Sequence, residues 1–395
     1  MTEKQLRNQK TATKRLFEED SSRKEFQAVV VSCENAGESV WNVVLDRTAF
    51  FPEGGGQAGD TGWLDEIPVI DTVEKDGVIF HKVTAPLETG VQVQGHLDFQ
   101  ERFSKMQQHT GEHILSGIVH GIYGYDNVGF HLGAEITTLD FNGELTAEQV
   151  QDVEVKVNEA IFANLPVLVH YPSKEELENF DYRSKIEIEG QVRLVEIPGV
   201  DLCACCAPHV KFTGEVGILK ILSCERHRGG CRLSIVCGMR SLLDYQQKQQ
   251  MTGKVSALLS AKPEKLDEAV QHLQEQQQKL REQLNRIQNI YLQEKLEKIH
   301  AQDSCVCIFE ESMDSIAMRN FVNGAMERCG GICGAFLGNE KVGYQYILGS
   351  STKNVREIAQ ILNAQFQGKG GGKPQMVQGS LKGTEAEIRA CLETF

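Results

Sequence analysis

The sequence predicts a multidomain protein of the α+β class, and three observations lead to this prediction. The chain has 395 residues, which is too long for one ordinary hydrophobic core, so roughly two to four domains are expected. Apolar residues alternate with a period of two in residues 25–99, whereas from Leu266 onward they recur in steps of four and three. Elsewhere helix and strand patterns alternate without the regular spacing of βαβ units.

Residues 1–24 are predicted to form a flexible N-terminal tail. The start of the chain carries basic residues but no apolar stretch, so a secretory signal is not expected. No apolar run approaches the ~20 residues that span a bilayer. The 12 cysteines are scattered, and we expect most of them to be small buried apolar residues. These features predict a cytoplasmic protein with no membrane partner.

Residues 25–99 are predicted to form a small β-barrel domain. Its expected strands cover residues 27–32, 39–46, 68–73, 77–83 and 91–97. The most distinctive loop contains Gly54, Gly55, Gly56 and Gln57 in succession. Adjacent glycines let the backbone turn sharply or approach another group closely. The loop is therefore either a wide hairpin turn or a segment whose amides face a nucleotide or the neighbouring catalytic domain.

Residues 100–240 are predicted to form a central α+β domain that binds a metal ion. His109 and His113 lie four residues apart in a predicted helix, so their imidazoles fall on one helix face. Cys205 and His209 repeat the same spacing further along the chain. Three imidazoles and a thiolate suit Zn²⁺ better than hard cations, which prefer oxygen ligands. We predict one zinc ion per chain; the alternative is a set of buried cysteines and unrelated histidines.

The other elements of this domain are predicted from the same patterns. Helices are expected over residues 102–119 and 146–162, the second beginning with the capping-box residues Thr146 and Gln149. Strands are expected at residues 128–131, 134–141, 167–171, 192–196, 217–222 and 231–237, completing one mixed sheet.

A run of basic residues directly follows the second ligand pair. It consists of Lys211, Lys220, Arg226, Arg228, Arg232 and Arg240, with only two acidic residues among them. The net charge of -14 argues against non-specific nucleic-acid binding by the whole surface. The basic run can still provide a local surface for phosphates.

Residues 241–303 are predicted to form a helical arm. A long helix is expected over residues 263–300, because its apolar residues repeat in heptads typical of a coiled coil. The heptad positions are Leu266, Val270, Leu273, Leu280, Leu284, Ile287 and Tyr291. The partner helix comes either from a second subunit or from residues 241–259 of the same chain.

Residues 304–395 are predicted to form a separate small α/β domain. We expect strands at residues 305–309, 331–337 and 342–348 and helices at residues 314–327 and 355–366. A glycine-rich segment with Lys369 and Lys373 follows. Its spacing is one residue too short for a phosphate loop and Pro374 replaces the required Ser or Thr, so an ATP site is rejected. We expect a loop that holds a nucleic-acid backbone.

Four stretches in order resemble the alanyl-tRNA editing proteins of the long AlaX type. They are residues 51–57, the His109 and His113 pair, residues 201–217 and the C-terminal glycine-rich segment. The resemblance extends from Leu16 onward and includes the editing and C-terminal domains of alanyl-tRNA synthetase. It implies an ATP-independent hydrolase that serves translation fidelity by cleaving the ester of tRNA(Ala) mischarged with serine or glycine.

The resemblance also implies roles for individual residues and domains. His109, His113, Cys205 and His209 match the zinc ligands of the family, and the C-terminal domain resembles its tRNA-binding and dimer-forming domain. We therefore expect a homodimer formed through the helical arm and this domain. The segment Cys205-Cys206-Ala207-Pro208-His209 departs from the commonest motif, Cys-Gly-Gly-Thr-His. Both ligands remain, a role for a threonine hydroxyl is put in doubt, and Cys206 is either a packing residue or an alternative ligand.

Hydrolysis of an activated ester requires a positioned water and stabilisation of charge, so further polar residues are expected near the metal. Glu112 is a candidate base or partner of a ligand, and otherwise a solvated side chain. His131 and Glu135, predicted on one strand face, are further catalytic candidates, with a structural role as the alternative. The expected substrate-binding residues are Gly54, Gly55, Gly56, Gln57, Thr110, Arg232, Lys369 and Lys373. Thr110, Thr137 and Thr138 could each meet a serine hydroxyl.

Two other functions are compatible with these motifs. His109, Glu112 and His113 also fit the inverzincin pattern of a metallopeptidase, which leaves Cys205 and His209 without a role. A non-catalytic tRNA-binding protein with a structural zinc is the other alternative, because four protein ligands can close a zinc site.

Overall fold

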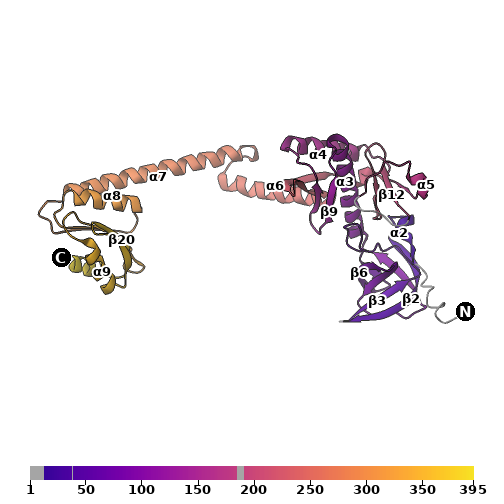
Figure 1. Cartoon of the computed structure of the whole chain (residues 1–395), viewed down its shortest axis with the longest axis horizontal. Coiled ribbons are helices and arrows are strands. Elements are labelled where there is room, and N and C mark those ends of the chain that lie inside the picture. Colours follow the sequence, from indigo (N-terminus) through magenta and orange to yellow (C-terminus); the bar gives the residue numbers. More distant parts are fainter. Residues whose placement is uncertain (1–12, 38, 185–190) are drawn as a thin grey trace. The chain divides into compact units, whose positions relative to one another are not determined.

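The computed structural model describes residues 13–37, 39–184 and 191–395 (Figure 1). The chain divides into two compact units, Met1–Thr252 and Gly253–Phe395, and the boundary lies within helix α6 (Met239–Leu259). None of the helices in the described part of the chain combines the length and the hydropathy of a membrane span. The finer division into five segments remains a prediction.

The first unit begins with the predicted β-barrel, which is confirmed. Its closed strand order is β2-β3-β7-β6-β5-β8. The strands are β2 (Glu25–Gly37), β3 (Val40–Leu45), β5 (Gly62–Leu64), β6 (Ile67–Lys75), β7 (Val78–Val83) and β8 (Gln92–Leu97). Alternate residues such as Val43, Leu45 and Val83 are fully buried in its interior. The short strand β5 was not predicted, because three residues are too few to show a period of two.

Residues 13–24 do not form the expected flexible tail. Strand β1 (Lys14–Arg15) pairs in parallel with β4 (Arg47–Thr48), and helix α2 (Leu16–Glu19) follows it directly. Leu16 and Phe17 are buried. Two adjacent apolar side chains are too short a pattern to be recognised in a charged segment. Residues 1–12 lie outside the described part of the chain.

Helix α3 (Phe99–Tyr123) is the central element of the first unit. It begins where the Asp98 side chain accepts a hydrogen bond from the Glu101 amide, 3.1 Å, and ends at Gly124, whose φ of 69° is left-handed. Helix α4 (Ala147–Phe162) begins at the predicted capping box of Thr146 and Gln149. Both helices pack against one apolar core, so most of α3 is buried.

The strands of the central region form two antiparallel sheets instead of the one mixed sheet that was predicted. The larger has the order β14-β15-β10-β9 and the smaller β11-β12-β13. The bounds are β9 (Asn127–Leu132), β10 (Thr137–Phe141), β14 (Leu219–His227), β15 (Gly230–Cys237), β11 (Leu168–His170), β12 (Leu194–Ile197) and β13 (Asp201–Ala204). Helix α5 (Lys174–Leu177) lies between β11 and β12 in the chain, and the 3-10 helix η1 (Thr213–Val216) lies between β13 and β14. Sequence patterns specify strands but not which strands share a sheet.

In the second unit the end of α6 is followed by the 3-10 helix η2 (Pro263–Lys265) and then by the long helix α7 (Leu266–Glu297). The predicted helix is confirmed, whereas its pairing with another helix remains a prediction. Leu280 and Ile287 are 66% and 65% exposed, and only Leu292 and Leu296 near the end of α7 are buried. These two pack against helix α8 (Ser315–Met326).

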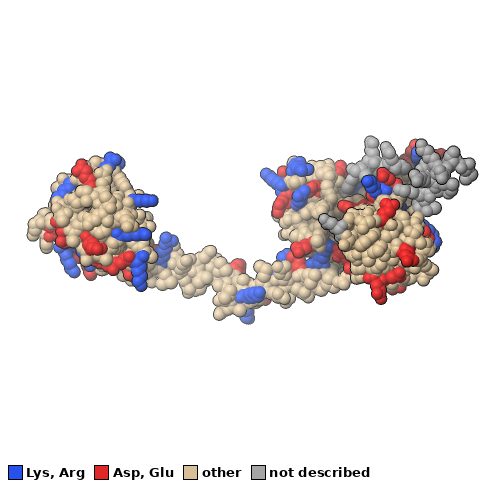
Figure 2. Space-filling model, turned by 90° about the horizontal axis from the view of Figure 1, so that it is seen from below, with Lys and Arg blue, Asp and Glu red and all other residues tan. Residues whose placement is uncertain are grey.

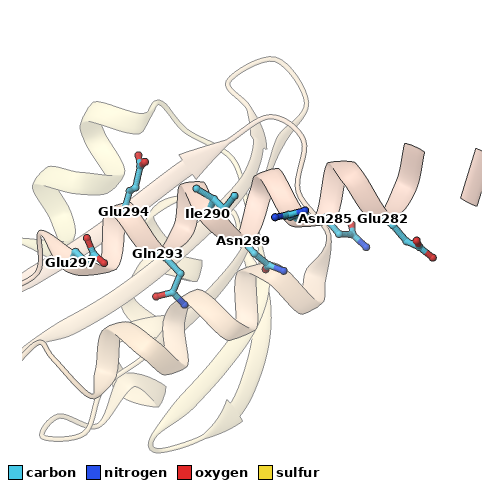
Figure 3. Close-up of a pocket in the computed structure, with 8 residues that line it drawn as sticks. Glu282, Asn285, Asn289, Ile290, Gln293, Glu294 and Glu297 are labelled. Atoms are coloured by element: carbon cyan, nitrogen blue, oxygen red, sulfur yellow. The ribbon is translucent and has the colours of Figure 1, made fainter. Parts of the chain in front are cut away.

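One face of α7 carries a shallow hollow of about 560 Å³ (Figure 3). Its lining residues are Glu282, Asn285, Arg286, Asn289, Ile290, Gln293, Glu294 and Glu297. All of them belong to α7, so the hollow is a space between exposed side chains of one helix and not an enclosed cavity.

The C-terminal domain is a five-stranded sheet with the order β16-β17-β18-β20-β19. Its strands are β16 (Cys305–Glu310), β17 (Ile332–Asn339), β18 (Gly343–Gly349), β19 (Lys369–Lys373) and β20 (Met376–Leu381). Helix α8 covers one face, while α9 (Val355–Gln365) and α10 (Glu385–Leu392) belong to the core of the other.

The glycine-rich segment forms the β19–β20 hairpin, so its prediction as a loop is wrong. Its glycines allow unusually close strand packing: a Cβ on Gly370 would lie 2.5 Å from the carbonyl oxygen of Gln378. Glycine has low strand propensity, so the hairpin depends on pairing with β18 and not on a local pattern.

Candidate metal centre

The structure brings together the four predicted metal ligands. One ligand atom from each of His109, His113, Cys205 and His209 lies within 4.8 Å of the others. Helix α3 supplies the first two on one face, and the turn after β13 supplies the others. The three histidines are buried and Cys205 is partly exposed.

Each imidazole is oriented by an oxygen atom on its outer side. The contacts join His109 Nδ1 to Gln57 Oε1 at 3.1 Å, His113 Nδ1 to Asp201 Oδ2 at 3.0 Å, and His209 Nδ1 to Thr110 Oγ1 at 3.0 Å. The Nε2 atoms of His109 and His209 lie 3.5 and 3.4 Å from the Cys205 sulfur. Such outer partners fix the orientation and tautomer of metal-binding histidines.

The charges of the cluster favour a divalent cation. Burial disfavours the thiolate, yet the imidazoles of His109 and His209 hold the pKa of Cys205 well below its ordinary value. Burial also disfavours a charged His113, but hydrogen bonds with Asp201 and Cys205 raise its pKa well above the ordinary value. Burial lowers the pKa of His209 to about 3. A metal ion would bind the thiolate and neutral imidazoles and displace the remaining proton.

Glu112 is a buried neighbour of this group, so its alternative interpretation as a solvated side chain is wrong. Its Oε1 atom accepts hydrogen bonds from Ser116 Oγ at 2.8 Å and Asn127 Nδ2 at 2.6 Å. Its Oε2 atom lies 3.8 Å from His113 Nε2. Helix α3 thus supplies a fixed carboxylate beside its own metal-ligand candidates.

The predicted pairing of His131 and Glu135 on one strand face is wrong. Strand β9 ends at Leu132, so Glu135 lies in the turn before β10. Both side chains are exposed, and neither belongs to the group of four. An alternating pattern that continues through a turn cannot be distinguished from a longer strand by sequence alone.

The glycine loop turns tightly and also lies against the central domain. Gly54 and Gln57 exchange two backbone hydrogen bonds of 3.0 Å. The amide of Leu132 donates to the carbonyl of Gly56, 3.2 Å, and a Cβ on Gly56 would lie 2.8 Å from the ring of Phe130. That ring packs against His109 with a centroid distance of 4.8 Å. The loop is therefore a tight turn that also packs against the central domain, but it does so through the Gly56 carbonyl and not through its amides as predicted. It closes one side of the metal centre.

Cys206 is exposed and is not one of the four grouped ligands. Its sulfur would lie 3.7 Å from a Cβ on Gly55, so it contacts the glycine loop. Desolvation by its neighbours raises the pKa of the thiol. These contacts agree with a packing role at the edge of the centre.

The three threonine candidates differ in their surroundings. Thr110 is buried and contacts His209 as described above, and its Oγ1 atom also accepts a hydrogen bond from the Val210 amide, 3.3 Å. Thr137 is buried and Thr138 is partly exposed in strand β10. The described contacts of Thr110 therefore place it behind the ligand candidate His209, and its role in substrate binding remains a prediction.

The basic run is largely neutralised by acidic residues from other segments. Arg232 binds both carboxylate oxygens of Asp140, at 2.6 and 2.8 Å, which leaves its expected role in substrate binding without structural support. The other ion pairs are Lys211 with Asp20, Lys220 with Glu154 and Arg226 with Glu144. Figure 2 shows basic and acidic side chains interspersed on the visible face of both units.

Lys369 and Lys373 lie in the second unit, on strand β19. The antiparallel register places them on one hairpin face with Gln378 of β20. Arg319 of α8 donates to Gln378 Oε1 at 2.7 Å and adds a third positive charge to this face. All three basic residues are exposed.

Several residues of the centre were not identified from the sequence. Asp201 contacts the ligand candidate His113, whereas Asn127 and Ser116 donate hydrogen bonds to the Glu112 carboxylate. Ser21 donates a hydrogen bond to the carbonyl of His209, 2.7 Å. Asp201 contacts His113, which lies 88 residues away in the chain, so no local spacing indicated this contact. The contacts of Ser21 and Asn127 follow from the fold alone.

Three family descriptions match parts of the chain. Residues 2–101 match "tRNA synthetases class II (A)", residues 192–233 match "Threonyl and Alanyl tRNA synthetase second additional domain", and residues 302–395 match the "DHHA1 domain". The second of these segments contains Cys205 and His209, and the third contains the β19–β20 hairpin.

Similar curated proteins carry related names. The chain is 36% identical to "Alanyl-tRNA editing protein AlaX-L" of Pyrococcus horikoshii over 238 residues, which cover 58% of this chain and 59% of that protein. It is 29% identical to "Alanyl-tRNA editing protein Aarsd1" of Rattus norvegicus, covering 96% and 97% of the two chains. It is 33% identical to "Alanyl-tRNA editing protein Aarsd1-B" of Xenopus laevis, covering 63% and 65%. The match thus spans less than two thirds of the first and third proteins and nearly all of the second.

Proposed function

Because the chain belongs to the family of AlaX-type alanyl-tRNA editing proteins, we propose that it is a trans-editing hydrolase of mischarged tRNA(Ala). The substrates are chiefly Ser-tRNA(Ala) and also Gly-tRNA(Ala). Water adds to the carbonyl carbon of the aminoacyl ester, the carbon–oxygen bond to the ribose breaks, and the ribose oxygen takes up a proton. The products are the free amino acid and uncharged tRNA.

The observation that carries this proposal is the buried group of three imidazoles and one thiolate. Its donor set fits Zn²⁺, and an oxygen atom contacts the outer nitrogen of each imidazole. His109, His113, Cys205 and His209 would hold the ion. When bound, zinc supplies Lewis-acid chemistry, acting on water or on the amino or hydroxyl group of the substrate.

The residues around this group have separate roles in the proposed reaction. Glu112 accepts the proton of the attacking water, because its carboxylate is fixed by Ser116 and Asn127 beside His113. The glycine loop and Phe130 cover His109 and limit the access of bulk water. Selectivity for serine requires a polar group that meets the serine hydroxyl and is left unpaired with alanine.

The exposed β19–β20 hairpin is the proposed contact with the tRNA backbone. Lys369, Lys373 and Arg319 present three positive charges on one face, and the glycines between the lysines leave the backbone accessible to phosphates. The exposed apolar stripe of α7 is the proposed dimer contact, with a second copy supplying the partner helix.

The remaining alternatives predict different outcomes. A metallopeptidase would not need Cys205 and His209, whereas both lie in the same cluster as His109 and His113. A non-catalytic tRNA-binding protein would keep the metal for stability alone and would bind tRNA without hydrolysing it.

The proposal is tested by incubating the zinc-loaded protein with Ser-tRNA(Ala), Gly-tRNA(Ala) and Ala-tRNA(Ala). We expect rapid loss of the serine ester, loss of the glycine ester, and survival of the alanine ester. His109→Ala should abolish hydrolysis. His120→Ala is a matched control, because His120 lies on the same helix but pairs with Asp126 on the surface. Binding of tRNA without hydrolysis of any ester would instead support the non-catalytic alternative.

A further inference from the structure

The segment around helix α2 contacts the turn that carries Cys205 and His209. Ser21 Oγ donates a hydrogen bond to the carbonyl oxygen of His209, 2.7 Å, and Asp20 forms an ion pair with Lys211, 3.1 Å. Asp20 also accepts hydrogen bonds from the amide and hydroxyl of Ser22, at 3.1 and 2.6 Å, which fixes the turn after α2. Figure 1 shows α2 between the barrel strands and the small sheet that contains β12.

Apolar contacts join the same two segments. Phe17 of α2, Phe51, Ile79 and Ala207 form one buried cluster, and Cys205 packs against it. The rings of Phe17 and Phe51 meet edge to face with centroids 5.5 Å apart. Ala207 lies between the two ligands in the chain, so the ligand turn rests on side chains from α2 and the barrel.

The segment is also attached to the helix that carries the other two ligands. Arg102 of α3 donates from Nη1 to the carbonyl oxygen of Ser21, 3.1 Å. Ser21 therefore links α3 to the ligand turn, with its carbonyl facing Arg102 and its hydroxyl facing His209. The two halves of the ligand set are separated by about ninety residues in the chain, and this link joins them through a third segment.

We infer that residues 16–22 are a positioning element of the metal centre. They hold the backbone of the ligand turn at the distance from α3 that lets all four ligands bind one ion, and Ser21 is the residue that makes the direct contact. The inference rests on the metal centre of the proposed function, but not on its substrate or reaction. It predicts that the loss of one hydroxyl far from the ligands in sequence weakens metal binding.

The expected loss of zinc affinity in Ser21→Ala can be judged from residues that hydrogen-bond to metal ligands, because removing such a residue typically lowers metal affinity about 10- to 100-fold. Ser21 contacts the ligand backbone and not the imidazole, so we expect an effect near the lower end, about tenfold. Ser21→Thr keeps a hydroxyl and should retain most of the affinity. Thr252→Ala is the matched control, because its hydroxyl donates to the carbonyl of Lys248 within α6 and lies outside residues 16–22.

The experiment measures the zinc dissociation constants of the full-length wild type, Ser21→Ala, Ser21→Thr and the control variant by competition with a chromophoric chelator. The absorption spectrum of the Co²⁺-loaded proteins reports the geometry of the ligands independently of activity. We expect weaker binding and an altered spectrum for Ser21→Ala only, with unchanged thermal unfolding of the metal-free protein. Phe17→Leu removes the ring contact with Phe51 and is a second test of the same element. This variant should also bind zinc more weakly than the wild type.

The outcomes separate this inference from the proposed function. Equal zinc affinity and equal Co²⁺ spectra in wild type and Ser21→Ala would overturn the positioning role, even if the ester is hydrolysed. Weaker binding by Ser21→Ala would support it, even if no aminoacyl ester is a substrate. Failure of the wild type to bind either metal would reject both the zinc centre and its positioning element.

Discussion

Arg102 offers the sharpest test of how the barrel is joined to the metal-binding domain. Among the described residues it is one of the largest fully buried side chains, and it extends from α3 to residues of the barrel domain. Its guanidinium forms an ion pair with buried Asp60 and donates to the carbonyl oxygens of Ala49 at 2.7 Å and Ser21 at 3.1 Å. The Asp60 carboxylate also accepts a hydrogen bond from the Phe51 amide, 2.7 Å. Arg102→Met removes the cation and leaves the buried carboxylate in place.

The expected loss of stability follows from the burial of both Arg102 and Asp60. Breaking a buried ion pair by removing one member costs about 3–5 kcal/mol, because the remaining charge cannot be solvated. We therefore expect Arg102→Met to lower the free energy of unfolding of the barrel by about 4 kcal/mol, which is roughly a thousandfold change in the unfolding equilibrium. Arg102→Met combined with Asp60→Asn removes the unpaired charge and should recover a substantial part of this loss.

The assay is urea unfolding followed by tryptophan fluorescence. The chain contains two tryptophans, and both Trp41 and Trp63 lie in barrel strands, so the signal reports this domain directly. A loss below about 1 kcal/mol for Arg102→Met, or a double variant less stable than the single one, would contradict the assignment of Arg102 as a buried charge partner.

Three further predictions concern pH, tRNA and assembly. Burial lowers the pKa of His81 from 6.5 to about 4, so between these pH values the unfolded chain binds a proton at His81 whereas the folded barrel does not. The free energy of unfolding should therefore be highest above pH 6.5 and fall by about 3 kcal/mol as the pH is lowered to 4. Urea unfolding across this range checks the slope, which His81→Gln should reduce. Lys369→Ala with Lys373→Ala should weaken tRNA binding and lower its salt dependence by about two counterions, and an unchanged slope would exclude phosphate contacts there. Leu280→Glu with Leu284→Glu should convert the expected dimer to a monomer in light scattering, whereas a monomeric wild type would reject the dimer itself.

Sequence patterns were sufficient for most element types. Helix α4 begins at Thr146 as its capping box predicted, and the long α7 follows its heptads, because both signals depend on residues a few positions apart. Segments without such a signal were missed or misassigned. Residues 13–24 pack against the barrel through Leu16 and Phe17, and the glycine-rich segment becomes a strand pair only by adding to β18.

The candidate metal ligands could be identified from the sequence, since two four-residue spacings of histidine and cysteine specify a soft nitrogen and sulfur donor set. Which of the other polar residues belong to the centre depends on how the chain folds. The fold placed Gln57 and Asp201 behind ligands, fixed Glu112 beside them, and left Glu135 in an exposed turn. The physical reason is distance along the chain: a ligand pair within one helix is set by local geometry, whereas contacts between distant segments depend on the packing of the whole unit.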